Sequence, residues 1–215
     1  MKRNNWHNYY KDTQYKMKAS NLILHWQYLL KIILSRPKSI LEIGCGPANH
    51  SIFIKFFLKN SNLYLLDNDR LILEEIKKRY NSRVNRYFNL DVLDSEKIKK
   101  IPKVDLVMSQ GLLEHFNDGD FVRILKNFSG AAKKMIFSAP SEHYGSKDFG
   151  NERLRSKREI EDLLKKSNLK KYRVCRYFDI GIRTKITQIS KGKINLRNII
   201  RTLFQSNHLF VEIEY

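Results

Sequence analysis

A mostly apolar run followed by a glycine turn, at residues 39–51, constrains the fold of this chain more than any other stretch. Residues 40–43 have the apolar character typical of a parallel strand that is covered on both faces. Gly44 and Gly46 then let the backbone turn sharply and approach a ligand where a Cβ would clash. Residues 49–51 can open a helix, whose free N–H groups favour polar or anionic ligand groups. The stretch predicts either a cofactor-binding turn or a plain strand-to-helix turn.

Two classes of cofactor use such a turn. A dinucleotide site has the pattern G-x-G-x-x-G, but its third glycine would fall on Asn49. The segment instead resembles motif I of the class I S-adenosylmethionine-dependent methyltransferases, acidic-x-Gly-x-Gly-x-Gly. Ala48 stands in place of the third glycine, a small-residue departure that the family often shows. The resemblance implies that the residues of this turn bind S-adenosyl-L-methionine: Glu42, Gly44, Cys45 and Gly46.

An acidic residue follows the next apolar run. Asp67 ends residues 63–66, which are predicted to form the second strand, and lies about 20 residues after Gly44. At that spacing a nucleotide site places a carboxylate beside the ribose hydroxyls, since one carboxylate can accept hydrogen bonds from both hydroxyl groups. We expect Asp67 and the adjacent Asn68 to bind the cofactor. The alternative role for Asp67, or for Asp69, is to cap the following helix, and the two roles can coexist.

The resemblance to the methyltransferases continues after the third and fourth predicted strands. An acid after the third strand, residues 84–90, would sit beside the adenine ring, which implies roles for Asp91 and Val92. Alternatively, Asp91 could lie in a turn and contact only solvent. Residues 110–116, after the fourth strand, resemble the segment that lies under the methionine moiety in enzymes of the ubiquinone/menaquinone-biosynthesis type. The cofactor residues implied there are Gln110, Gly111 and Leu112.

The same segment argues against two classes of nucleic-acid methyltransferase. Amino-group enzymes carry an Asn/Asp-Pro-Pro-aromatic tetrapeptide at this position, and cytosine-carbon enzymes carry a Pro-Cys nucleophile. Neither occurs here. His115 is the first candidate for a general base, because an imidazole titrates in the useful range, although it could instead pack against or cap its helix. His143 and Tyr144, in a long polar loop, are further catalytic candidates. Glu114 and Asp118 could bind a metal, but no spacing demands one.

The order of elements predicts the fold class. Strands and helices alternate to about residue 166, and two strands follow near residues 174–178 and 210–214. This order predicts an α/β fold with a doubly wound sheet. The resemblance implies the seven-stranded, mostly parallel, Rossmann-like methyltransferase sheet with its last strand antiparallel. Residues 37–215 would form that domain.

Residues 1–36 are predicted to form an N-terminal helical arm, because apolar residues recur at helical spacing. The arm could lie across the substrate pocket and supply aromatic walls, or it could simply pack on the sheet. Its candidate wall residues are Trp6, Tyr9, Tyr10 and Tyr15.

Charge and cysteine content bear on partners and compartment. A net charge of +19 over 215 residues is compatible with RNA, an acidic membrane surface or an anionic small molecule, or with solvated charge that has no specific partner. Residues 183–201 are basic and are the best candidate for a surface that binds anions. Two cysteines and the lack of an apolar N-terminal segment favour a cytoplasmic protein.

These features favour a methyltransferase that moves a methyl group from S-adenosylmethionine to an oxygen, nitrogen or carbon of a small-molecule acceptor. One alternative is an RNA methyltransferase that uses residues 183–201. Another is a non-catalytic module that binds S-adenosylmethionine. A nicotinamide oxidoreductase fits least, because of Asn49 and the predicted pair of terminal strands. The identity of the acceptor and the oligomeric state stay open.

Overall fold

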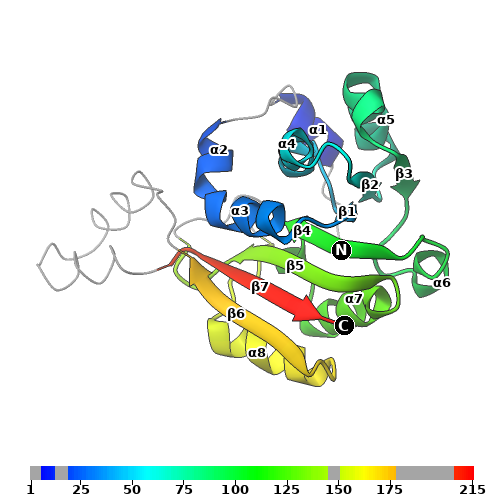
Figure 1. Cartoon of the computed structure of the whole chain (residues 1–215). Coiled ribbons are helices and arrows are strands. Elements are labelled where there is room, and N and C mark those ends of the chain that lie inside the picture. The colour runs from blue at the N-terminus through cyan, green and yellow to red at the C-terminus, as the bar shows by residue number, and fades with distance from the viewer. Residues whose placement is uncertain (1–5, 13–18, 145–150, 178–205) are drawn as a thin grey trace, which may run out of the picture.

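A seven-stranded sheet organises the computed structural model, which describes residues 6–12, 19–144, 151–177 and 206–215 (Figure 1). Across the sheet the strands follow the order β3-β2-β1-β4-β5-β7-β6. They are β1 (Ser39–Ile43), β2 (Asn62–Asp67), β3 (Arg86–Asn89), β4 (Val104–Gln110), β5 (Ala132–Pro140), β6 (Lys171–Tyr177) and β7 (His208–Glu214).

Five strands pair in parallel and β7 runs against its neighbours. β1 lies between β2 and β4, with Leu41 opposite Tyr64 on one side and opposite Val107 on the other. β7 is antiparallel to both β5 and β6. The predicted fold class is therefore confirmed, including the antiparallel last strand.

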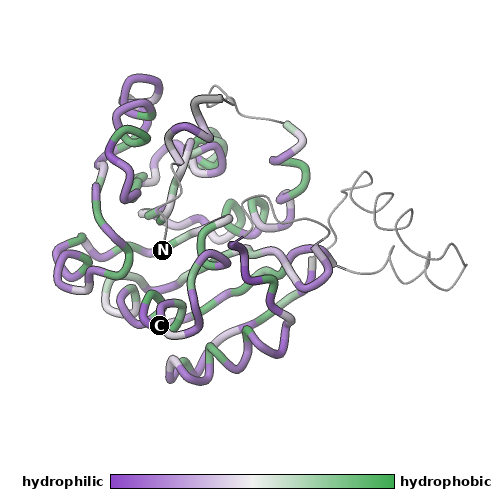
Figure 2. Tube along the Cα trace, turned by 180° about the vertical axis from the view of Figure 1, so that it is seen from behind, coloured by the Kyte–Doolittle hydropathy of each residue, from purple (hydrophilic) through white to green (hydrophobic). Residues whose placement is uncertain are grey.

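Helices cover both faces of the sheet. They are α1 (Trp6–Asp12), α2 (Ala19–Leu24), α3 (Trp26–Ser35), α4 (Asn49–Phe57), α5 (Arg70–Tyr80), α6 (Ser95–Ile98), α7 (Asp118–Ser129) and α8 (Lys157–Lys166), with short 3-10 turns η1 (Asn81–Arg83) and η2 (Leu113–His115). In Figure 2 the helices carry alternating hydrophobic and hydrophilic bands, as amphipathic helices do.

Alternate residues of the central strands pack in two separate hydrophobic cores. Leu106 and Met108 of β4 pack in a core with α3, α4 and α5, whereas Val107 between them packs in a core with α6, α7 and α8. Successive side chains of a strand point to opposite faces, so a central parallel strand buried on both faces is apolar throughout. The sheet is doubly wound for this reason.

Side chains at the helix starts fix where several helices begin. Ser156 and Glu159 form the predicted capping box of α8, in which each side chain bonds to the other residue's backbone N–H. Asp69 caps α5, because its Oδ1 accepts from the backbone N–H groups of Leu71 and Ile72. The capping role that the sequence allowed for Asp67 or Asp69 therefore belongs to Asp69.

Some predicted boundaries differ from the structure by a few residues. The third strand, expected over residues 84–90, spans only Arg86–Asn89, because the chain still leaves the 3-10 turn η1 (Asn81–Arg83) at residues 84 and 85. The arm is helical where it is described, as α1, α2 and α3. Tyr15 and residues 183–201 lie outside the described residues. No helix in the described part of the chain combines the length and apolar character needed to cross a bilayer.

Candidate functional site

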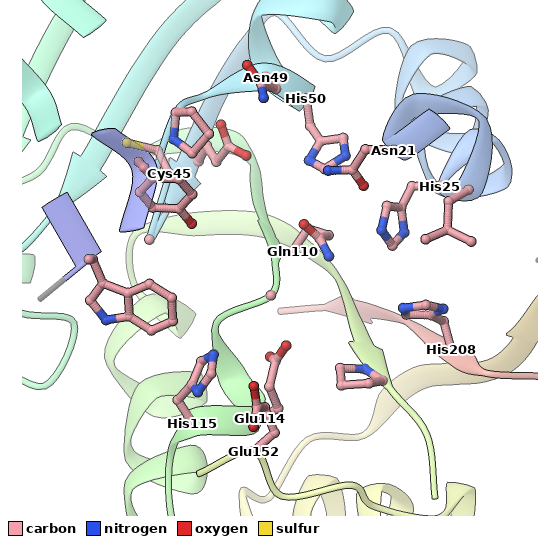
Figure 3. Close-up of a pocket in the computed structure, with 18 of the residues that line it drawn as sticks. Asn21, His25, Cys45, Asn49, His50, Gln110, Glu114, His115, Glu152 and His208 are labelled. Atoms are coloured by element: carbon pink, nitrogen blue, oxygen red, sulfur yellow. The ribbon is translucent and has the colours of Figure 1, made fainter. Parts of the chain in front are cut away.

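Two adjoining cavities open at the carboxyl ends of the parallel strands. The glycine-turn cavity, about 150 Å³, lies over the ends of β1, β2 and β3 and the start of α5. The histidine cavity, about 230 Å³, lies between the end of β4, helices α1 and α2, and the start of β7 (Figure 3). Residues shared by the two walls are Trp6, Tyr10, Gly44, Gly111 and His115. A ligand in one cavity would therefore meet a ligand in the other at these residues.

The glycine turn needs its glycines for two separate reasons. Gly44 and Gly46 have φ of +60° and +46°, in the left-handed region that side chains disfavour. A Cβ on Gly44 would lie 2.6 Å from Cδ1 of Leu112, and one on Gly46 would lie 2.7 Å from the hydroxyl oxygen of Tyr10. The turn thus leaves a cradle that a side chain would fill, as a site for a closely held cofactor requires.

Asp67 ties this turn to the end of β2. Its Oδ2 accepts from the backbone N–H of Gly46 at 3.0 Å, and its Oδ1 accepts from the backbone N–H of Asp69 at 2.9 Å. Burial raises the pKa of the carboxyl group. A carboxylate has about four acceptor positions, so two remain for the hydroxyl groups of a ribose. Asp67 can therefore organise the turn and also bind a cofactor.

Glu42 is held beneath the turn by a serine. The hydroxyl of Ser51, in α4, donates to Oε2 of Glu42 at 2.5 Å. Burial raises the pKa of Glu42 to about 8, an effect that the bond from Ser51 opposes. The Glu42 carboxyl is therefore mostly protonated at neutral pH, which makes it a neutral hydrogen-bonding group.

Every residue that the sequence assigned to the cofactor lines one of the two cavities. Those in the glycine-turn cavity, the histidine cavity or both are Glu42, Gly44, Cys45, Gly46, Asp67, Asn68, Asp91, Val92, Gln110, Gly111 and Leu112. Asp91 and Val92 lie at the β3 side, with Val92 buried and Oδ1 of Asp91 accepting from the backbone N–H of Leu93. The set suits S-adenosyl-L-methionine, since it joins a glycine cradle to carboxylates placed for hydroxyl and amine groups.

His115 stands at the boundary between the cavities. Its Nδ1 lies 3.0 Å from Oδ1 of Asn151, and its ring makes an edge contact with Trp6 at 5.0 Å. An amide oxygen can only accept, so Nδ1 carries the proton and Nε2 keeps the lone pair that a base needs. Burial lowers the pKa of His115, which keeps the imidazole neutral near pH 7.

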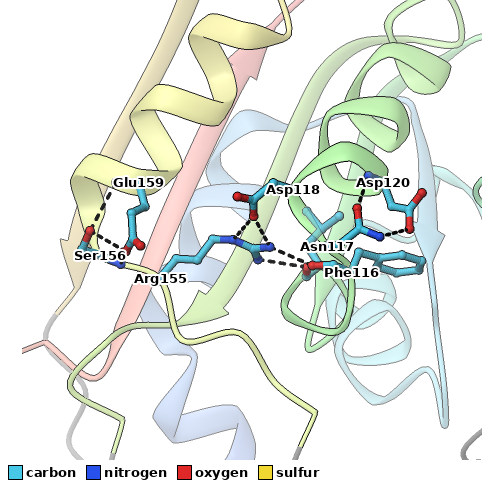
Figure 4. A network of polar contacts seen from close by, with 8 residues as sticks. Phe116, Asn117, Asp118, Asp120, Arg155, Ser156 and Glu159 are labelled. Carbon is cyan, nitrogen blue, oxygen red and sulfur yellow. Dashed lines mark hydrogen bonds and ion pairs between the residues drawn. The ribbon is translucent and has the colours of Figure 1, made fainter. Parts of the chain in front are cut away.

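A buried arginine holds the loop that carries His115 (Figure 4). Nη2 of Arg155 donates to the carbonyl oxygen of Phe116 at 2.7 Å and to Oδ1 of Asp118 at 2.9 Å. The guanidinium also lies 5.0 Å from the ring centre of Phe121. Its planar set of donors reaches one carbonyl and one carboxylate at once. Arg155 therefore connects the segment before α8 to the loop after β4.

The other two catalytic candidates lie in different places. Tyr144 lines the histidine cavity, and its ring makes an edge contact with His208 at 5.1 Å. His143 is not among the described residues that line either cavity, and its Nε2 lies 3.5 Å from Oε1 of Glu142. The structure thus brings His115 and Tyr144 to the site but does not bring His143 there.

Sequence reasoning missed a cluster of three buried histidines. His25 precedes α3, His50 lies in α4 and His208 starts β7, yet the His25 ring lies 5.3 Å from that of His50 and 5.0 Å from that of His208. Glu152 was also missed. No spacing in the sequence links these residues, because each comes from a different element. Among the described residues, no group of three or more His, Cys, Asp or Glu is arranged to hold a metal ion.

Comparisons with known proteins agree with this geometry. Residues 40–134 match the family model described as "Methyltransferase domain". No curated protein matches the sequence. Solved structures do match, and several are longer proteins of which the chain spans 53% to 60%.

Three of the matched structures illustrate the likeness. One is a chain of the complex between the Haloferax volcanii Trm112 methyltransferase activator and a methyltransferase, with 12% identity, a TM-score of 0.73, and 100% of this chain and 99% of that one covered. The second is the methyltransferase domain of a bacterial Hen1, with 16% identity, a TM-score of 0.65, and 91% and 100% covered.

The third is magnesium protoporphyrin IX methyltransferase from Synechocystis PCC 6803 with bound S-adenosylmethionine, with 13% identity, a TM-score of 0.55, and 88% and 80% covered. At such identities the structures establish the fold. The family match and the fold together support a class I S-adenosylmethionine-dependent methyltransferase with S-adenosyl-L-methionine as its cofactor.

Proposed function

We propose that this chain methylates a small molecule that binds in the histidine cavity. The observation that carries the proposal is the junction of the two cavities, where Gly44, Gly111 and His115 belong to both walls. A cavity of about 230 Å³ is somewhat smaller than the usual small-molecule sites, whose range begins at roughly 300 Å³. Helix α1 supplies the wall that separates this space from solvent, through Trp6 and Tyr10.

The residues of the glycine-turn cavity would bind the cofactor. Gly44 and Gly46 leave room for the cofactor to contact the protein backbone. Asp67 would accept hydrogen bonds from its ribose hydroxyls, and Asp91 would accept one from its adenine amine. When bound, the cofactor supplies a methyl group that its sulfonium already activates. The protein therefore has to align the acceptor atom with this methyl group and to exclude water. Alignment alone can lower the activation barrier by about 7–11 kcal/mol.

His115 is the proposed general base. Asn151 holds its Nδ1–H, so that Nε2 can accept the proton of an acceptor hydroxyl or amine. Tyr144, which also lines this cavity, is proposed to orient the acceptor through its hydroxyl. An acceptor that has already lost its proton near neutral pH would need only the alignment.

The test has two parts, of which the first concerns the cofactor. Calorimetric titration with S-adenosylmethionine, S-adenosylhomocysteine and NAD is made on the wild type, on Asp67→Ala and on Asp162→Ala, a control on the exposed face of α8. We expect micromolar binding of the two sulfur ligands only, about 10-fold to 100-fold weaker in Asp67→Ala because a charge-assisted bond is worth about 1.5–3 kcal/mol. Binding of NAD, or of none of the three, would contradict the assignment.

The second part concerns the acceptor. The protein is incubated with S-adenosylmethionine labelled on its methyl group and, separately, with the small-molecule fraction and the RNA of a cell extract. Label in the small-molecule fraction supports the proposal. Label in RNA would favour the RNA methyltransferase, and cofactor binding without any transfer would favour the non-catalytic module.

A further inference from the structure

The charge of the histidine cavity is opposite to that of the chain. The chain carries a net charge of +19. Among the described residues that line the cavity, Glu114 and Glu152 are acids in addition to Glu42, which is mostly protonated at neutral pH, and none is lysine or arginine. Lysines and arginines are thus kept away from the described wall of this cavity, although they exceed the acids almost twofold in the chain as a whole.

Glu114 and Glu152 occupy one end of this cavity. Figure 3 shows both side chains there, together with the ring of His115. Glu114 and Glu152 are only 5% and 7% exposed. Their segments are joined, because the backbone N–H of Arg153 donates to the carbonyl oxygen of Glu114 at 2.8 Å. A cavity wall lined by acidic groups and without lysine or arginine favours a ligand that carries a positive charge.

At the opposite end of the cavity, His25 and His50 add no positive charge at neutral pH. Burial lowers the pKa of His50 to about 4, and burial, followed by the two neighbouring histidines, lowers that of His25. His50 is 5% exposed and lines the cavity. Within the described part of the chain, its Nε2 has no hydrogen-bond partner. A buried ring nitrogen in this state indicates a polar group of a ligand that would complete the bond.

Aromatic rings close the third side. Trp6 and Tyr10 stack with ring centres 6.2 Å apart, and Tyr9 contacts both. All three line the cavity. The faces of such rings attract cations, with a free energy of about 0.5–2 kcal/mol for each contact. An aromatic wall of this kind is compatible with a ligand that carries a positive charge.

We propose that the acceptor is a small molecule with a positively charged amino group, which Glu114 and Glu152 bind, and with a polar group that bonds to Nε2 of His50. The proposal rests on the proposed function and narrows its substrate class. The amino group is the part that the cavity recognises, and the methylated atom can be another part of the molecule. Anionic acceptors, which the net charge alone made plausible, are excluded by the same two carboxylates.

The test uses pairs of probes that share a skeleton and differ in charge: tyramine with 4-hydroxyphenylacetate, histamine with imidazole-4-acetate, and cadaverine with glutarate. Binding of each is measured by calorimetry to the full chain saturated with S-adenosylhomocysteine, at physiological salt. We expect at least one amine to bind 10-fold or more tightly than its carboxylate partner. Glu114→Gln and Glu152→Gln should each reduce that ratio about 10-fold, and the surface control Glu161→Gln should keep it.

The outcomes separate this inference from the proposed function. Equal or tighter binding of the carboxylates overturns the inference, as does the absence of binding by every probe while S-adenosylhomocysteine is bound. An unchanged ratio in both glutamine variants overturns it as well. Retained binding of S-adenosylhomocysteine in the variants shows that they fold. Failure of the wild type to bind S-adenosylhomocysteine would instead contradict the proposed function.

Discussion

The two cavities are built in different ways. The glycine-turn cavity is made mainly by short segments at the ends of adjacent strands, around residues 44–46, 66–68, 90–92 and 111–112. The histidine cavity takes two or three residues from each of α1, α2, α4 and η2, and one from each of the position before α3, the segment before α8 and the start of β7. The first uses backbone shape and strand-end acids, whereas the second uses side chains that are far apart in the chain. The proposed cofactor site is thus encoded in local motifs, whereas the adjoining cavity, proposed as the acceptor site, is not.

The largest expected effect comes from breaking the glycine-turn cavity alone. Gly44→Ala places a side chain at φ +60°, which costs about 1–2 kcal/mol, and sets its Cβ against Leu112. With Leu112 pushed into the cavity, we expect affinity for S-adenosylhomocysteine to fall about 100-fold by calorimetry. The control is Gly130→Ala, where φ is −87° and no heavy atom lies within 4 Å of the added Cβ. Equal affinities of the two variants would contradict this account of the turn.

A second variant acts at the boundary of the two cavities. His115→Gln should lower kcat about 100-fold, as loss of a general base does, and change KM for S-adenosylmethionine less than about 3-fold. In the wild type, the decline of kcat on acidification should be centred below pH 6.5, the pKa of an ordinary imidazole, because burial lowers the pKa of His115. His143→Gln, whose ring lines neither cavity, should keep kcat. An equal loss in His143→Gln would favour the other histidine as the base.

The smallest effect is on stability, where two buried groups of the histidine cavity should have opposite pH dependences. Glu42 has its pKa raised from 4.5 to about 8 in the folded chain, so the folded state binds more protons between these values. The free energy of unfolding should therefore fall as pH rises from 4.5 to 8. His50 has its pKa lowered from 6.5 to about 4, so the unfolded state binds more protons there, and its contribution makes stability rise from pH 4 to 6.5.

Urea denaturation at several pH values measures both contributions. The unfolding free energy of Glu42→Gln minus that of the wild type should rise by roughly 2–4 kcal/mol as the pH rises from 5 to 8. The same difference for His50→Gln should rise by roughly 2–3 kcal/mol as the pH falls from 6.5 to 4.5. Both figures follow from about 1.4 kcal/mol for each pKa unit. Stability curves that stay parallel to that of the wild type in both variants would contradict these protonation states.

The sequence predicted different parts of the molecule unequally well. Asp67 was placed by its spacing from Gly44 and Asp91 by the resemblance to the methyltransferases, and the two lie in one cavity because parallel strands bring their carboxyl ends to one edge. The capping box at Ser156 was equally clear, since both partners lie within one helical turn. His25, His50 and His208 gave no such signal. The same spacing rules assign no role to single histidines in three unrelated elements.

The sequence by itself thus determined the doubly wound sheet, the glycine turn and the acids beside it, because each depends on contacts within a few residues or on the fixed geometry of parallel strands. The tertiary structure alone decided which charged groups line the histidine cavity. A chain with net charge +19 encloses Glu114 and Glu152 in a wall without a described lysine or arginine. Composition sums charge over the chain, whereas binding depends on the few groups that folding brings to one cavity.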